Sequence, residues 1–181
     1  MKTLLFFLLA CTATYAQEFK VTPTGLVSKK QATANYVVAH FDSIPSDTLY
    51  ANAKKYILSK YSGIKNPITT DEKGSLLRFE TGDQVMSTLT KKNSEIKYMG
   101  ATTATLEFKD GKVKISYGSI SVSMTTGDTT KELPLTSFWN NKGKLVDGET
   151  KKITETHFNA STRLLIDAMG NMNNKTVSSE W

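Results

Sequence analysis

The chain has 181 residues, with 23 Lys and Arg against 17 Asp and Glu, and a formal net charge of +6. A single cysteine, Cys11, excludes a disulfide scaffold and a zinc site built from cysteines. The composition also excludes a collagen, a coiled coil and a protein with several transmembrane helices, and the length suits one domain with short extensions.

The N-terminus has the organisation of a secretory signal peptide. Leu4–Ala10 is a run of seven apolar residues, far shorter than the roughly 20 that span a membrane. Small residues then stand three and one before the end of the segment, as a cleavage site requires. We therefore expect a signal peptide over 1–16, export to the periplasm or the extracellular space, and a mature chain that begins at Gln17 and has no transmembrane span. The alternative is that Leu8–Cys11 is a lipobox, which would leave the protein lipid-anchored through Cys11.

The first part of the mature chain contains an arm, a strand and a helix. Residues 17–32 show no periodicity and are expected to form an extended N-terminal arm. A core domain is expected over 33–126. It opens with a strand over 36–41, where apolar residues alternate with polar ones. An amphipathic helix follows over 46–61, because apolar residues recur there at three and four positions.

From 68 to 126 the pattern changes to short alternating runs separated by turn residues. Apolar residues alternate with polar ones over 112–117 and with serine over 119–124. Asp110-Gly111 is a strong signal for a two-residue hairpin with a type I′ turn. A period of two with one apolar face predicts an antiparallel sheet that is covered on one side and open, with many Ser and Thr residues, on the other.

The C-terminal part is predicted to contain one long loop and one helix. Residues 127–150 are expected to form the loop, and 151–170 an amphipathic helix that packs on the sheet, followed by a polar tail over 171–181. The order strand, helix, antiparallel strands, helix predicts an α+β domain. We expect a curved antiparallel sheet with both helices on one face.

Three segments carry a likeness to a known family. They are Ile44–Tyr50 at the start of the first predicted helix, Lys54–Ile57 within it, and Thr105–Ile115 around the predicted hairpin. Together they resemble a bacterial family known as a domain of unknown function with a TBP-like fold, common in exported proteins of Bacteroidetes. The resemblance implies a curved sheet over about 35–126 and no catalytic residues. The name of the fold does not imply DNA binding.

No catalytic, cofactor-binding or metal-binding residue is predicted. The two histidines, His40 and His157, have no ligand at the short spacings of known zinc motifs. The two Ser-x-x-Lys matches, which begin at Ser62 and Ser94, are as many as chance provides, and the companion motifs of that enzyme class are absent. The sequence therefore favours a protein that is not an enzyme and uses no cofactor.

The basic charge comes almost entirely from lysine, with 21 Lys and only two Arg. Proteins that read nucleic acids depend on the bidentate contacts of Arg, so a nucleic-acid partner is not expected. A weak attraction to anionic surfaces and self-association into a homo-oligomer stay open.

The leading functional hypothesis is a non-enzymatic interaction or structural module of the bacterial envelope, with an unidentified envelope partner. That partner would contact the open face of the sheet or the 127–150 segment, with candidate contact residues Ser119, Ser121, Ser123 and Trp139. One alternative is a carrier that holds a small apolar ligand in a cavity between the sheet and the helices. The residues expected to line that cavity are Tyr56, Phe79, Phe108, Tyr117, Phe158 and Leu165. A second alternative is a hydrolase with dispersed catalytic residues.

Overall fold

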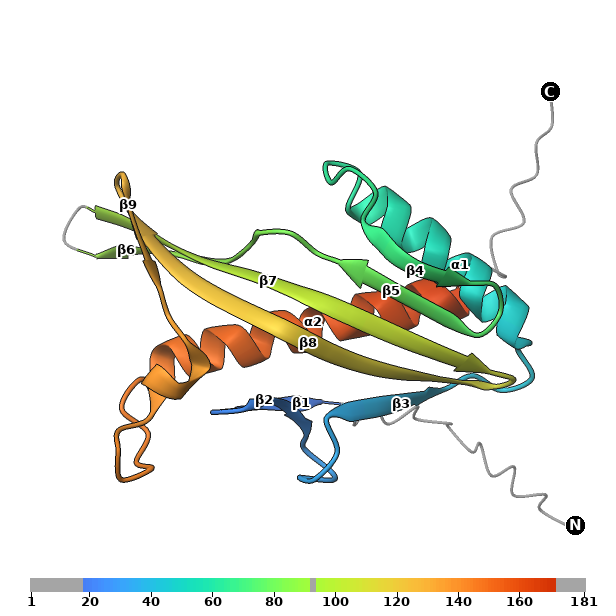
Figure 1. Cartoon of the computed structure of the whole chain (residues 1–181), viewed down its shortest axis with the longest axis horizontal. Coiled ribbons are helices and arrows are strands. Elements are labelled where there is room, and N and C mark those ends of the chain that lie inside the picture. The colour runs from blue at the N-terminus through green and yellow to red at the C-terminus, as the bar shows by residue number, and fades with distance from the viewer. Residues whose placement is uncertain (1–17, 92–93, 172–181) are drawn as a thin grey trace, which may run out of the picture.

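The computed structural model describes residues 18–91 and 94–171 (Figure 1). Within these residues two α-helices, α1 (Ser46–Lys60) and α2 (Gly148–Asn171), and a 3-10 helix, η1 (Leu135–Phe138), accompany nine strands. The strands are β1 (Phe19–Thr22), β2 (Gly25–Ser28), β3 (Tyr36–His40), β4 (Ile68–Glu72), β5 (Leu76–Glu80), β6 (Gln84–Lys91), β7 (Ser94–Lys109), β8 (Lys112–Thr126) and β9 (Thr129–Glu132). The expected signal peptide, and all but the first residue of the expected tail, lie outside the described residues.

Seven of the described strands form one antiparallel sheet around the long pair β7 and β8. The half of this pair nearest its turn carries β3, β5 and β4, in the order β3-β8-β7-β5-β4. The other half carries β6 beside β7 and β9 beside β8. Figure 1 shows both helices on the same side of the two long strands. The predicted α+β architecture, with an antiparallel sheet and two helices, is confirmed.

The predicted turn between β7 and β8 is present, with Lys109 and Lys112 paired across it. Of its two central residues only Gly111 has a positive φ, at 71°. A type I′ turn needs positive φ at both central residues, so the expected turn type is wrong although the hairpin itself is confirmed.

The core fills the space between the sheet and three covering elements, namely α1, α2 and the β1–β2 hairpin. Tyr117 of β8 lies where these elements meet. Its ring packs edge-on against Phe19 of β1, with 5.3 Å between ring centroids, and lies 5.2 Å from the ring of Phe158 on α2. Burial of these large apolar side chains is the main source of stability for such a layered domain.

The expectation of an extended arm over 17–32 is wrong, because this segment contains the β1–β2 hairpin. Phe19 and Val21 have no exposed surface, and Leu26 is only 2% exposed. The hairpin forms because the strands bury these side chains against the sheet and α2, a partner that lies far away in the sequence.

The expectation of one long loop over 127–150 is also wrong. This segment contains β9 and η1, and Phe138 at the end of η1 is fully buried. α2 begins at Gly148, three residues before the predicted start at 151. The earlier start follows from Asp147, whose side-chain Oδ1 accepts a hydrogen bond of 3.0 Å from the Thr150 amide in the manner of a helix N-cap. Neither described α-helix is long and apolar enough to cross a membrane.

A β-bulge interrupts the pairing of β7 and β8 near their middle. Ala101 is paired with Ser121, but the next pair is Thr103 with Gly118, so β8 contains one extra residue there. Ser119 within the bulge has a φ of 48°, a left-handed conformation that is uncommon for serine. The bulge reverses the alternation of β8, so that Tyr117 and Val122 both face the core.

Candidate functional site

The space between the sheet and the helices, where a carrier would hold its ligand, is closely packed. A gap of about 10 Å³ remains there, bordered by Tyr56, Tyr61 and His157 among others. A gap of this size holds about one water molecule, whereas ligand cavities measure roughly 300 Å³ or more. Of the six residues expected to line a cavity, five are buried in the core and the sixth, Tyr56, is partly buried and packs against it. The packing of this region therefore argues against the carrier hypothesis.

Burial shifts the pKa values of titratable groups around this gap. Burial raises the pKa of Tyr61 to about 12, and the hydroxyl of Tyr117 makes a hydrogen bond of 2.9 Å with that of Thr162. Burial and, after it, the charge of Lys60 lower the pKa of His157. The raised pKa keeps the phenol of Tyr61 neutral at physiological pH.

The predicted contact residue Ser119 lies in a notch at the edge of the sheet. β3 pairs with β8 as far as Ser116 and β9 pairs with it from Ser123 onward, so the intervening edge of β8 has no neighbouring strand among the described residues. The notch is a hollow of about 310 Å³. Its lining comes from three segments, namely 23–25 in the β1–β2 turn, 117–120 in β8, and 134–136 before and within η1.

Ser121 and Ser123 lie on the outer face of the sheet, the face away from the helices, because the intervening Val122 is buried in the core. Ser121 is exposed. Ser123 is only 8% exposed and is paired with Met99 on one side and Glu132 on the other. Because of the bulge, Ser119 does not continue this row. The structure thus separates the three predicted serines instead of presenting them together.

Trp139, the fourth predicted contact residue, is half-buried and begins a short loop that leads to α2. Its ring stacks on Phe138 with 6.0 Å between centroids, and its backbone forms an isolated bridge to Leu145. Leu145 and Val146 are 42% and 60% exposed. The sequence analysis missed these two residues, although two adjacent apolar residues in a polar loop were a usable signal. We call residues 139–146 the apolar loop.

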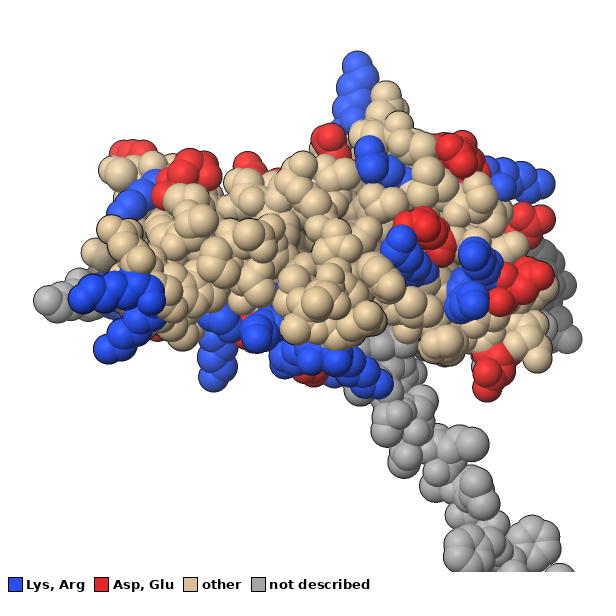
Figure 2. Space-filling view, turned by 60° about the horizontal axis from the view of Figure 1, so that its bottom comes forward, with Lys and Arg blue, Asp and Glu red and all other residues tan. Residues whose placement is uncertain are grey.

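The outer face of the sheet carries a mixture of charges. Figure 2, in which the lower side of Figure 1 comes forward, shows Lys and Arg side chains gathered along one edge of the molecule, both signs of charge mixed at one end, and an uncharged area between them. A groove of about 480 Å³ on this face is lined by residues of β3, β7 and β8. They are Tyr36, Val38, His40, Glu107, Lys109, Lys112 and Lys114. The sequence analysis did not bring these residues together.

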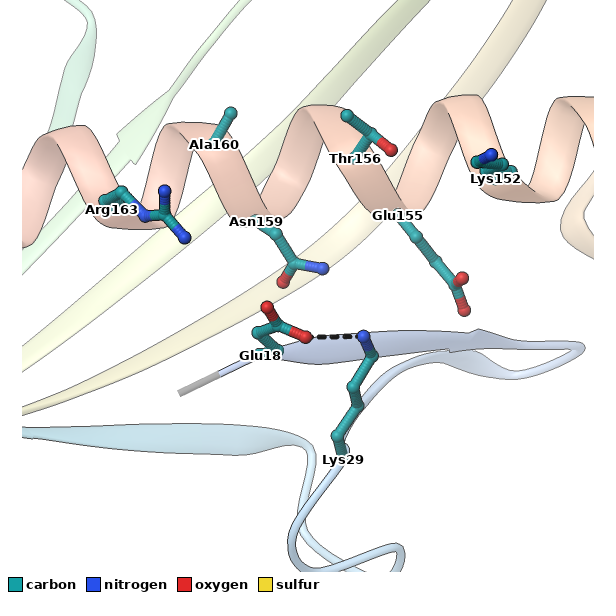
Figure 3. A pocket seen from close by; sticks show the side chains of 8 residues that line it. All are labelled: Glu18, Lys29, Lys152, Glu155, Thr156, Asn159, Ala160 and Arg163. Atoms are coloured by element: carbon teal, nitrogen blue, oxygen red, sulfur yellow. Dashed lines mark hydrogen bonds and ion pairs between the residues drawn. The ribbon is translucent and has the colours of Figure 1, made fainter. Parts of the chain in front are cut away.

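A second polar hollow, of about 430 Å³, lies between α2 and the β1–β2 hairpin (Figure 3). Asn159 of α2 holds the hairpin from here, since its Oδ1 accepts a hydrogen bond of 2.7 Å from the Phe19 amide and its Nδ2 donates one of 3.1 Å to the Phe19 carbonyl. Glu155 accepts a hydrogen bond of 2.8 Å from the Val21 amide. These side chains replace a neighbouring strand at the edge of β1, so the hollow is a structural junction.

Neither histidine has the surroundings of a general base. His40 is exposed and lies across the strand pair from Lys112. His157 packs against the ring of Phe158 at 5.4 Å, near Lys60. A catalytic imidazole is usually oriented by a carboxylate, and both environments are instead cationic or apolar. Among the described residues no group of three or more His, Cys, Asp and Glu side chains is placed to hold a metal ion.

Comparison with known proteins identifies the fold. No protein-family model matches the chain, and no curated protein matches it significantly. Two solved structures are similar. One is a DUF4468 family protein from Bacteroides ovatus, with 17% sequence identity and a TM-score of 0.54 over 77% of this chain and 87% of that one. The other is a TBP-like protein from Parabacteroides distasonis, with 13% identity and a TM-score of 0.50 over 74% of this chain and 90% of that one.

The chain has a TBP-like fold. This likeness confirms the resemblance found in the sequence, to a Bacteroidetes domain of unknown function of TBP-like architecture, as a likeness of fold. It also agrees with the observed sheet, which carries both helices on one face. At these identities the comparison describes the architecture and assigns no activity or partner.

Proposed function

We propose that this protein is a non-enzymatic interaction module of the bacterial cell envelope, exported by the signal peptide expected over 1–16. The observation that carries the proposal is the one-sided construction of the sheet. Its inner face is covered by α1, α2 and the β1–β2 hairpin, while neither α-helix covers its outer face. The notch at Ser119 adds a hollow of about 310 Å³ at the sheet edge. An antiparallel sheet that is solvated on one side is available for a partner.

The proposed contact surface joins the notch and the apolar loop. Leu135 lines the notch, and η1 leads directly from it to Trp139 at the start of the loop. Leu145 and Val146 then add exposed apolar surface at the end of the loop. Exposed apolar side chains are typical of protein interaction sites, and charged residues are depleted at the centre of an interface. We therefore prefer this region to the highly charged sheet edges as the contact surface for a protein partner.

The test is site-specific photocrosslinking in the envelope of the source bacterium. A photoreactive residue is placed at Thr136, an exposed residue that lines the notch, or at Leu145 in the apolar loop. Leu58 on α1, which is 47% exposed, is the control position. We expect one crosslinked product from the first two positions and none from Leu58. Crosslinks of equal strength at all three positions, or none at any, would contradict the proposed surface.

The proposed export is tested separately by intact-mass measurement of the protein purified from its own host. A chain that begins at Gln17 supports secretion in soluble form. A diacylglyceryl-modified Cys11 would instead show a lipid-anchored protein. An unprocessed Met1 in a cytoplasmic fraction would contradict the envelope location.

A further inference from the structure

The strand register places three basic side chains in one row on the outer face of the sheet. His40 of β3 is directly opposite Lys112 of β8, and Lys112 is directly opposite Lys109 of β7. Directly paired residues of adjacent strands point to the same face, with Cβ atoms about 5 Å apart. We call these three residues the basic row.

Such an arrangement is electrostatically unfavourable in the free protein. Like charges directly opposite each other on a sheet are destabilising. None of the ion pairs found among the described residues includes Lys109 or Lys112. The nearest carboxylate along the chain, that of Asp110, accepts a hydrogen bond from the Ser46 amide at the start of α1. Within the described part of the chain, Lys109 and Lys112 therefore have no ion-pair partner.

The neighbouring row shows the contrasting, compensated arrangement. Lys114 is opposite Glu107, and its Nζ lies 2.7 Å from the carboxylate. The same ammonium lies 4.9 Å from the centre of the Tyr36 ring, which adds a cation–π contact. The ammonium group of Lys114 is thus already paired. Lys114 lines the groove, but we do not expect its charge to bind the ligand.

The groove gives the basic row the shape of a binding site. Its volume of about 480 Å³ is lined by the basic row, by the ion pair of Lys114 with Glu107, and by the half-buried side chains of Tyr36 and Val38. A ligand in this groove would meet ammonium donors on one side and an aromatic ring with an aliphatic side chain on the other. Lysine binds phosphate-type anions as a mobile point charge.

We propose that the basic row binds a phosphate or sulfate group, and that the organic part of the ligand lies over Tyr36 and Val38. One anion between Lys109 and Lys112 would remove their mutual repulsion, so binding would stabilise the strand pair as well. This site lies at the turn end of β7 and β8, away from the bulge at Ser119, and does not depend on the proposed protein partner.

The experiment follows ¹⁵N chemical shifts and the Tm of the purified mature protein during titration with three probes. They are inorganic phosphate, glucose 6-phosphate and vesicles of phosphatidylglycerol, with glucose as the neutral control. We expect saturable shifts at the amides of the basic row with inorganic phosphate, and binding at least about tenfold tighter for the probe whose organic part fits the groove. Glucose 6-phosphate as the tighter probe indicates a phosphorylated sugar, and vesicles indicate a lipid headgroup.

Two variants and a matched control make the result specific. Lys112→Gln is expected to weaken binding about tenfold, because it removes the central charge-assisted hydrogen bond. Lys112→Glu is expected to abolish binding while raising the Tm of the free protein, because it replaces a like-charge pair by an opposite one. Lys131→Gln on β9, an exposed lysine elsewhere on the sheet, is expected to leave both quantities unchanged.

In Lys112→Glu, binding is expected to fall while the Tm rises. A lysine with only a structural role would not give these opposite changes. Shifts spread over lysines of the whole surface, or equal weakening by Lys112→Gln and Lys131→Gln, would show a general attraction to anions and overturn the proposal. A loss of Tm in Lys112→Glu would show that the basic row is not under repulsion, and would overturn it as well.

Discussion

The Asp110 carboxylate accepts a hydrogen bond of 2.9 Å from the Ser46 backbone amide. This contact joins the turn between β7 and β8 to the first turn of α1. The residue at the N-cap position of α1 is Pro45, which makes no side-chain cap hydrogen bond. The sheet therefore supplies the acceptor that the sequence next to the helix lacks, and a carboxylate at this end also suits the helix dipole.

Replacing this carboxylate is expected to destabilise the protein. Asp110→Ala should lower the free energy of unfolding by about 1 kcal/mol, the usual effect of losing a helix cap. Asp110→Asn should keep most of the stability because its amide oxygen accepts the same hydrogen bond. Urea denaturation measures both variants. Asp42→Ala, which removes an exposed carboxylate just before α1, is the control, and an equal loss in Asp42→Ala would contradict the capping role of Asp110.

Asn159 is expected to hold the β1–β2 hairpin in place. Asn159→Ala removes both hydrogen bonds to Phe19 and leaves its amide without that partner, so the loss of unfolding free energy should be about 1–3 kcal/mol. Hydrogen exchange at the Phe19 amide should accelerate more than exchange in the β7–β8 pair. Thr156→Ala, an exposed residue that lines the same hollow, should change neither quantity. Slow exchange at Phe19 in Asn159→Ala would show that the apolar contacts alone hold the hairpin.

The left-handed residue in the β8 bulge predicts an unusual order of substitutions. Ser119→Val should destabilise the protein by about 1–2 kcal/mol, because a β-branched residue resists a φ of 48°. Ser119→Gly should cost little, because glycine adopts this conformation without strain. Ser121→Val, at an exposed position of the same strand, should be neutral or stabilising. Thermal unfolding ranks the three variants, and a Ser119→Val that is as stable as Ser121→Val would contradict the bulge.

His157 is expected to make stability depend on pH below neutrality. Its pKa lies below the ordinary value of 6.5, because burial and then Lys60 disfavour the charged imidazolium. The unfolded chain therefore binds more protons than the folded one as the pH falls below about 6.5, so the free energy of unfolding decreases until the folded-state pKa is passed. His157→Gln should flatten this part of the profile.

The effect of His157 can be separated from that of paired carboxylates. The hydrogen bond from Lys54 lowers the pKa of Asp71 below its ordinary value of 3.8. The ionised Asp71 carboxylate therefore contributes fully to the free energy of unfolding at pH values above its ordinary pKa, and this contribution is lost only as the pH falls further. The hydrogen bond from Lys29 likewise lowers the pKa of Glu18 below its ordinary value of 4.5. Guanidinium denaturation at pH values from 5.5 to 8, above the range in which these carboxylates titrate, therefore reports on histidine. A slope that persists in His157→Gln would assign the dependence to another group.

Local patterns were sufficient for the central elements of the fold. The helix predicted over 46–61 is observed at Ser46–Lys60, and the hairpin at Asp110-Gly111 is present. Both depend on residues that are close in sequence, namely an apolar stripe of helical period in the first case and a turn between alternating strands in the second. The apolar positions also shift from odd to even numbers between Tyr117 and Ile120, which is the signature of the bulge.

Features that depend on distant partners were not predictable in the same way. The β1–β2 hairpin has strands of four residues, and its burial depends on α2 at the other end of the chain. The three serines form a regular pattern in the sequence, but one extra residue in the bulge separates Ser119 from the other two. The basic row requires the pairing of β3 with β8, which no local pattern specifies.

The hydrogen bonds between the Phe19 backbone and the Asn159 side chain join positions that are 140 residues apart. α2 is the last of the described elements, so the site that receives β1 does not exist until α2 has been synthesised. Contacts of such long range close slowly and late. An emerging chain therefore keeps β1 undocked until α2 is available. Under the proposed export, this order would keep the chain able to pass through a translocation channel.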